Sequence, residues 1–201
     1  MAGFAAISAA GMTIARLLNA CFQAEQPVDL QTTRAVLVQS ADFRTGANST
    51  GVVPAYAVSV FLYRVDFNKM MRAAWSAVGS LDGQSHLPVD LHFLLTPWAD
   101  NAVNEQRILG KAMQCLESTP ILSGPLLYPT TSWAANEGVQ LVLEDVGTEA
   151  IMRIFDSLEA EFRISVPYIA RIVRVDGTTV DAPPTVTSVV TGKTATAAPA
   201  P

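Results

Sequence analysis

The chain has 201 residues, half of them hydrophobic, and its 18 acidic and 13 basic side chains give a formal net charge of −5. This length and composition fit one folded domain with a sizeable buried core. The acidic balance, with a pI near 4.9, argues against broad binding to nucleic acid or to anionic membranes, because such binding requires a surplus of cations.

The first predicted element is an amphipathic helix at the N-terminus. Its apolar stripe recurs at spacings of three and four residues and comprises Phe4, Ile7, Gly11, Ile14, Leu18 and Cys21. The helix should end near Gln26, because Pro27 disfavours helical geometry in the residue before it. The stretch lacks the basic start of a signal peptide and carries Arg16 in its middle. Since no stretch reaches the roughly 18 uninterrupted apolar residues of a membrane span, we expect a cytoplasmic protein that does not insert into membranes.

Three strands are predicted in the first half of the chain. Residues 34–39 form a short, β-branched strand. Residues 58–65 carry apolar side chains on both faces, which places this strand inside the sheet with a layer on either side. Residues 87–95 alternate with period two, and Thr96 and Pro97 are expected to end this strand.

The second half is predicted to add two helices and two strands. The first helix ends before Pro120, and Thr148 can cap the second. The last strand spans residues 165–175, where Pro167 belongs on an edge, at a bulge or at the strand start, because it cannot donate a ladder hydrogen bond. The inward-facing residues are Leu109, Ala112, Met113 and Leu116 in the first helix, Val139, Leu141 and Leu143 in the first strand, and Ile151, Ile154, Phe155 and Leu158 in the second helix.

These elements predict one α+β domain over residues 1–181, in which a mixed β-sheet packs with about three helices. Residues 182–201 form a low-complexity arm of proline, threonine and alanine with few large side chains. Because the arm has too little apolar surface to fold alone, we expect it to be flexible in the isolated chain.

The two cysteines, Cys21 and Cys115, lie far apart in the sequence, each in a stretch that is typical of a helical apolar face. Free buried thiols behave as small hydrophobic side chains. We therefore expect both to be unpaired core residues in a reducing compartment.

No cluster of residues indicates catalysis or cofactor binding. His86, Asp90 and His92 share one strand face and are acceptable zinc ligands, but no further ligand accompanies them. Residues 190–194 imitate the end of a phosphate-binding loop, yet Thr187 takes the place of its first glycine. We expect no metal, no cofactor, no catalytic residue and no enzyme activity.

Candidate interface residues are four arginines and three valines. Arg64, Arg163, Arg171 and Arg174 could form a basic patch against an acidic partner surface, since guanidinium groups hold carboxylates at two points. Ordinary solvated strand edges explain the same arginines equally well. In the arm, the anchors for strand addition to a partner's sheet edge would be Val186, Val189 and Val190.

Short motifs are spread over residues 58–72, 87–122 and 155–176. They are Leu62-Tyr63-Arg64 with Asn68 and Arg72, then Leu87-Pro88 with Leu94-Leu95-Thr96, then Glu105-Gln106 with Leu109-Gly110, and finally Ser165-Val166-Pro167-Tyr168. In order, spacing and character this combination resembles the cap proteins of extracellular contractile injection systems, of the kind found in the Photorhabdus virulence cassette and the antifeeding prophage. The resemblance covers most of the domain, and it departs from the family pattern at Trp98-Ala99, where a tyrosine is common.

The resemblance implies a tail-terminator fold and a structural role. Such a cap forms a ring of identical copies, with six as the expected number, on the end of the tail tube and sheath that is distal from the baseplate. Its partners are further copies of itself, the tube protein and the sheath protein. Two alternatives stay open: a cytoplasmic assembly chaperone for a tail component, which would also need only a binding surface, and, with less support, a small ligand-binding or enzymatic α+β domain.

Overall fold

A six-stranded mixed sheet organises the chain. The computed structural model describes residues 3–45, 51–75, 84–134 and 136–177. The strands are β1 (Arg34–Val38), β2 (Ala57–Phe67), β3 (His86–Trp98), β4 (Ile121–Ser123), β5 (Gly138–Leu143) and β6 (Val166–Asp176). They lie in the order β1-β2-β3-β6-β5-β4, in which β1 and β2 are parallel and every other neighbouring pair is antiparallel. The predicted α+β class with a mixed sheet is confirmed.

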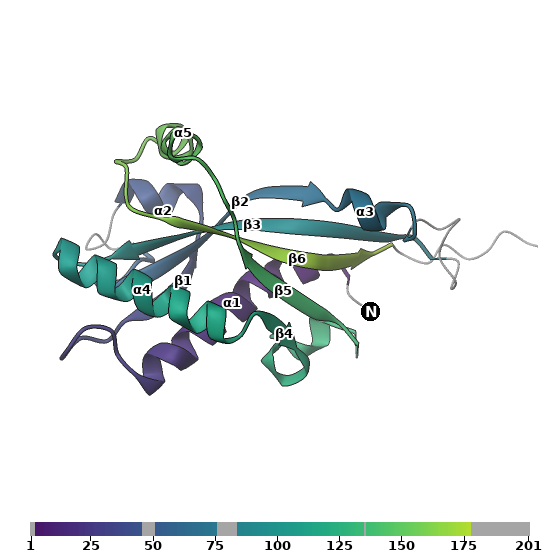
Figure 1. The fold of residues 1–201 in the computed structure, drawn as a ribbon, viewed down its shortest axis with the longest axis horizontal. Coiled ribbons are helices and arrows are strands. Elements are labelled where there is room, and N and C mark those ends of the chain that lie inside the picture. Colours follow the sequence, from purple (N-terminus) through teal and green to yellow (C-terminus); the bar gives the residue numbers. More distant parts are fainter. Residues whose placement is uncertain (1–2, 46–50, 76–83, 135, 178–201) are drawn as a thin grey trace, which may run out of the picture.

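Helices lie on both sides of this sheet (Figure 1). The three longer ones are α1 (Ala6–Ala24), α4 (Ala102–Ser118) and α5 (Thr148–Leu158), and two short ones are α2 (Ser40–Thr45) and α3 (Lys69–Arg72). In Figure 1, α1 and α4 lie below the sheet, α2 and α5 lie above one end of it, and α3 lies at the far end of β2 and β3. None of the helices in the described part of the chain is long and apolar enough to cross a membrane.

Each face of the sheet carries a hydrophobic core, because β2 and β3 point apolar side chains alternately to the two sides. Val60 and Phe93 join the larger core with Ile14 of α1. Leu94 and Trp98 join a smaller core under α2 and α5. Full burial of side chains of this size contributes about 1.5–3 kcal/mol each. The predicted layers on both sides of the strand over residues 58–65 are therefore present at this end of the sheet.

The N-terminal helix follows its predicted stripe except at its start. α1 begins at Ala6, so Phe4 precedes the first turn and is 93% exposed, which corrects its predicted inward position. Gly11 and Leu18 are buried as expected. At Gly11 a Cβ atom would lie 2.8 Å from Cδ2 of Leu37, so the glycine lets α1 lie close against β1.

Two predicted boundaries were wrong. β3 continues through Pro97 to Trp98, where it is paired with β2 alone, because its register with β6 ends at Leu95. A strand with a neighbour on only one side tolerates a proline. The N-cap of α5 is Gly147, without a side-chain hydrogen bond, and Thr148 is already the first helical residue. Pro167 lies at the start of β6, one of its predicted places.

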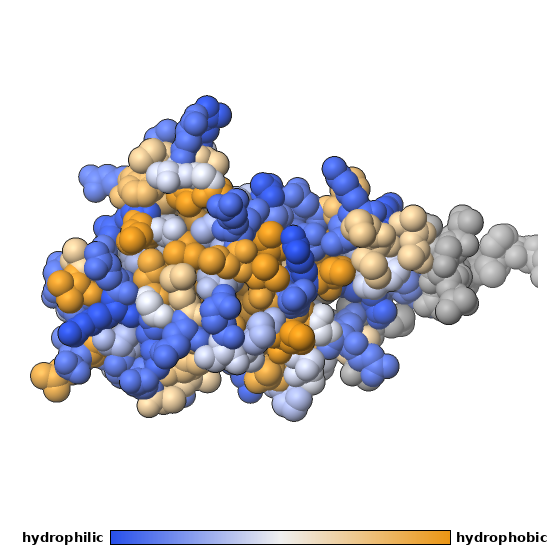
Figure 2. Space-filling view, viewed as in Figure 1, coloured by the Kyte–Doolittle hydropathy of each residue, from blue (hydrophilic) through white to orange (hydrophobic). Residues whose placement is uncertain are grey.

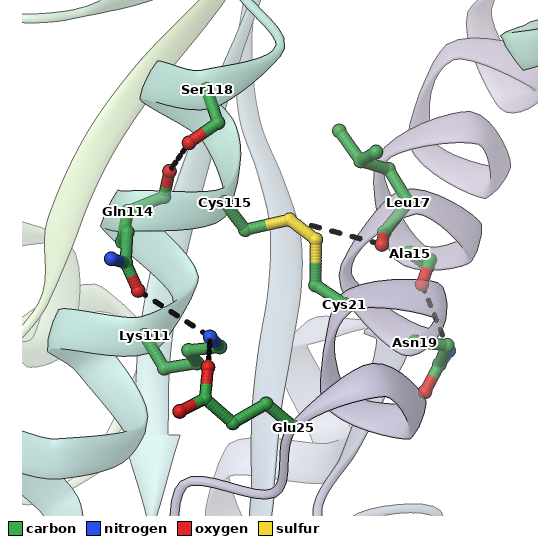
Figure 3. The surroundings of a disulfide bond; sticks show 9 residues. All are labelled: Ala15, Leu17, Asn19, Cys21, Glu25, Lys111, Gln114, Cys115 and Ser118. Carbon is green, nitrogen blue, oxygen red and sulfur yellow. Dashed lines mark hydrogen bonds and ion pairs between the residues drawn. A yellow bond between two sulfur atoms is a disulfide. The ribbon is translucent and has the colours of Figure 1, made fainter.

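The expectation of free thiols is also wrong. Cys21 on α1 and Cys115 on α4 form a disulfide, with their Cα atoms 6.3 Å apart (Figure 3). Both helices cover the same face of the sheet, so their inward stripes approach within the range that a disulfide spans. Beside it, Lys111 of α4 pairs with Glu25 at the end of α1. The inference of a reducing compartment rested on unpaired thiols and loses its basis.

Candidate functional site

One part of the sheet is not covered by any of the longer helices that the structure describes. The face that α2 and α5 cover near Trp98 continues toward α3 as an open groove of about 1350 Å³, lined by residues of β2, β3, β5 and β6 and of the segment around α3. Figure 2 shows hydrophobic patches over β5 and β6, interrupted by hydrophilic side chains. We call this hollow the groove, and the residues on it used below are Arg64, Phe67, Lys69, Met70, Ile121, Arg171 and Arg174.

Two β-bulges aim side chains into the groove. Leu62 pairs with Phe93 and Arg64 pairs with His92, so Tyr63 is an extra residue on β2. Because side chains alternate between the faces of a regular strand, the extra residue puts Tyr63 and Arg64 on the same face. A second irregularity between β3 and β6 does the same for Arg171 and Ile172, which both line the groove.

The Glu144 carboxylate is the centre of a polar network at the wall of the groove. Oε2 accepts from the Tyr63 hydroxyl at 2.7 Å and lies 2.8 Å from Nδ1 of His92. Oε1 accepts from Nη2 of Arg64 at 3.2 Å. Asp66 completes the network, with Oδ2 at 2.9 Å from Nε of Arg64 and at 3.3 Å from Nε2 of His92. One carboxylate thus joins the end of β5 to β2 and β3.

Opposing effects set the protonation of this network. Burial acts to raise the pKa of Glu144, but the hydrogen bonds from His92 and Tyr63 and the charges of His92 and Arg64 together hold it below the usual value. Burial and the hydrogen bond to Glu144 raise the pKa of Tyr63 well above its usual value. The carboxylate is therefore ionised and the phenol neutral at neutral pH.

A second network lies at the start of β3. Nδ1 of His86 lies 2.6 Å from Oδ1 of Asp176, at the end of β6. Nε of Arg174 lies 2.9 Å from the same oxygen and 3.1 Å from Oε1 of Glu137. Asp90 accepts instead from Asn68. His86, Asp90 and His92 therefore have separate partners, and within the part of the chain that the structure describes no group of three or more His, Cys, Asp or Glu residues could hold a metal ion.

The four predicted interface arginines do not form one patch. Arg64, Arg171 and Arg174 line the groove, whereas Arg163 lies near Trp98, with its guanidinium 4.3 Å from a ring centroid of that residue and 2.9 Å from Glu105. Arg64 and Arg174 are each engaged by two carboxylates. Arg171 is exposed and has no acidic partner among the described residues. The arm valines Val186, Val189 and Val190 and residues 190–194 lie outside the described residues.

Sequence reasoning missed Glu144. The only local signal for it was a pair of acidic side chains, Glu144 and Asp145, after the strand predicted over residues 139–143, and such residues are common on protein surfaces. Tyr63 and Arg64 were noticed through the family motif, without their shared partner. The pairing needed the three-dimensional arrangement of β2 and β5, which lie on opposite sides of β3 and β6.

Solved structures of tube terminators have the same fold as this chain. The chain is similar to a PVC sheath/tube terminator of an extracellular contractile injection system in the extended state, with a TM-score of 0.53, 16% identity, and coverage of 93% of this chain and 65% of that chain. It is also similar to the tube-terminating cap of the anti-feeding prophage, with a TM-score of 0.50, 16% identity, and coverage of 89% of this chain and 59% of that chain. The chain thus spans less than two thirds of the length of either structure.

The sequence itself identifies the family. The Pvc16 N-terminal domain family matches residues 9–188, and the chain belongs to this family. No sequence among the curated proteins matches the chain. The family resemblance seen in the three motif segments is confirmed.

Proposed function

We propose that this protein is a structural cap that ends the tube and sheath of a contractile injection particle. The observation that carries the proposal is the agreement of family and fold over nearly the whole chain: the family matches residues 9–188, and the terminator fold covers 93% of the chain. The proposal includes a structural role without catalysis.

The physical reason for a cap lies in how tubes grow. A tube of stacked rings is an open assembly, and it continues as long as its last ring presents the surface that the next ring binds. A terminator binds this surface and offers no equivalent one. In this proposal the chain forms a ring of six copies that contacts the tube protein and the sheath protein, and it is assembled in the cytoplasm of the producing cell.

The arm over residues 182–201 is part of the proposal as a separate contact element. Its composition supports binding to a partner better than independent folding, because Lys193 is its only charged residue and its few valines cannot form a core alone. We propose that the arm binds a neighbouring subunit or the underlying tube or sheath.

Electron microscopy of particles from a deletion strain tests the cap function. Without the protein, tube and sheath proteins should be made but assemble to abnormal or variable lengths, because nothing competes with addition of the next ring, while baseplates form normally. Re-expression of the wild-type chain should restore uniform particles with a sixfold ring at the distal end. Particles of normal length and contractility in the deletion strain would contradict the proposal.

A further inference from the structure

The groove contains two cations that no carboxylate of the described residues neutralises. Its four carboxylates are all engaged, Asp66 and Glu144 by Arg64 and His92, Asp90 by Asn68, and Glu137 by Arg174. Lys69 and Arg171 line the same groove and are exposed. Neither has an acidic partner within the part of the chain that the structure describes. These two residues are therefore available to a carboxylate from outside.

Large apolar side chains line the same groove as these two cations. Phe67, Met70 and Ile121 line the groove and are 54%, 89% and 59% exposed. Apolar residues gathered in a hollow with a few unpaired charges are typical of a protein interface, where the apolar area is buried and the charges fix the orientation.

A second surface, of opposite charge, lies at the other end of the sheet. Asp156 and Glu161 are exposed, and neither has a cationic partner among the residues that the structure describes. Met152 lies one helical turn before Asp156 on the same side of α5, and Met152, Phe162 and Ile164 are large apolar residues that are also exposed. We call these exposed residues of α5 and of the segment that follows it, Met152, Asp156, Glu161, Phe162 and Ile164, the α5 end.

One molecule cannot bring these two surfaces together. Glu161 lines a hollow with Trp98, the last residue of β3, whereas Trp75 of the groove lies beside His86, its first residue. β3 has 13 residues, and a strand rises about 3.3 Å per residue, so its two ends are roughly 40 Å apart. Arg171 lies opposite Asp90, eight residues before Trp98, which is roughly 26 Å along the strand. α5 and α3 accordingly lie over opposite ends of the sheet (Figure 1).

We propose that the α5 end of one copy docks into the groove of the next copy, so that Asp156 and Glu161 meet Lys69 and Arg171. The contact joins two different surfaces of the same chain, and such heterologous contacts build rings when the rotation closes. The inference rests on the proposed ring-forming function and supplies its subunit contact. The occupant is a second copy because the α5 end offers exposed carboxylates for the two cations of the groove and apolar side chains that can pack against those of the groove.

Charge reversal with mutual rescue tests this contact in particles. The groove variant carries Lys69→Glu and Arg171→Glu, and the α5 variant carries Asp156→Lys and Glu161→Lys. Each is expressed alone, as a tagged full-length chain, in cells that lack the native gene. Each variant should be reduced at particle ends by about tenfold or more, because like charges then face each other at every subunit contact. The tagged wild-type chain and the single reversals Arg107→Glu and Asp29→Lys, at exposed sites on other parts of the surface, serve as controls.

Co-expression of the two variants gives the decisive result. The groove variant keeps its acidic α5 end, which fits the unaltered groove of the α5 variant. The basic α5 end of the α5 variant fits the charge-reversed groove of the groove variant. A ring in which the two variants alternate should therefore form, and the protein should again be found at particle ends. The inference is overturned if either variant alone incorporates like wild type, or if co-expression restores nothing although both purified variants melt like wild type. Absence of the wild-type chain from particle ends would instead contradict the cap function, so the two failures are distinguishable.

Discussion

The side-chain amide of Asn19 forms hydrogen bonds with both the backbone amide and the backbone carbonyl of Ala35. Oδ1 accepts from the Ala35 amide and Nδ2 donates to the Ala35 carbonyl, each at 2.9 Å. Ala35 lies on β1, which is an edge strand of the sheet, and the Gln39 amide that follows this strand is held by Asp42 at 2.8 Å. Side chains thus occupy positions where another strand would bind, a common way to keep a sheet edge from pairing. Docking through the sheet face, as in the groove, is consistent with this closed edge.

Replacing Asn19 with alanine should lower the free energy of unfolding by about 2 kcal/mol, because the amide and carbonyl of Ala35 each lose their partner. Chemical denaturation measures the change, and light scattering should show increased self-association through the freed edge. Gln23→Ala, at an exposed position of the same helix, is the control and should have little effect. Equal stability of the two variants would show that water replaces the Asn19 amide without cost.

Reduction of the disulfide should destabilise the domain. Cys21 and Cys115 are 94 residues apart, and closing a loop of that length stabilises a protein by up to about 4–5 kcal/mol through the unfolded state. We expect reductant to lower the melting temperature of the wild type and to leave that of a Cys21→Ser, Cys115→Ser double variant unchanged. Identical melting of the wild type with and without reductant would contradict a formed disulfide in the purified protein.

Glu144 should contribute to stability in a pH-dependent way. Because its pKa in the folded protein is below the ordinary value of 4.5, its contribution is complete above that value and is lost as the pH falls through the folded pKa. Glu144→Gln should cost about 2 kcal/mol at pH 7, where Arg64 and His92 lose a partly buried charged partner, and the cost should shrink in acid.

Urea denaturation of this variant between pH 7 and pH 3 measures the effect. Glu149→Gln removes an exposed carboxylate that pairs only with Arg153 among the described residues, and it should change stability by less than about 0.5 kcal/mol. A Glu144→Gln variant with the same acid profile as the wild type would rule out this carboxylate as a source of acid sensitivity.

Truncation after Asp181 should separate folding from capping. The described core ends at β6, so the shortened chain should keep its melting temperature to within a few degrees. If the arm binds a partner as proposed, the truncated chain should be under-represented at particle ends relative to full-length protein. If the truncated chain is found at particle ends as often as the full-length chain, the arm is not needed for capping and the proposed role of the arm is wrong.

The spacing of apolar residues along the sequence was sufficient to predict most of the helices and strands. One side of each helix and strand is buried, so apolar residues recur in the sequence with the period of that element. The stripe through Ile14 and Leu18 and the alternation along β2 and β3 are examples. The short elements α2, α3 and β4 were missed because four to six residues, or three in β4, are too few to show a period. The family motifs added the terminator fold, which periodicity alone does not specify.

Only the tertiary structure decided which residues meet. Tyr63 and Glu144 are 81 residues apart, and their hydrogen bond depends on a bulge in β2 and on the strand order. The bond between Cys21 and Cys115 likewise depends on two helices covering the same face. Arg64 and Arg171 were equivalent candidates in the sequence, yet the fold pairs the first with two carboxylates and gives the second no acidic partner among the described residues. The residues next to it in the sequence determine whether a side chain lies on the buried or the exposed face of its helix or strand. Which distant residue it contacts depends on how the helices pack on the sheet, and the periodicity of the sequence does not contain that information.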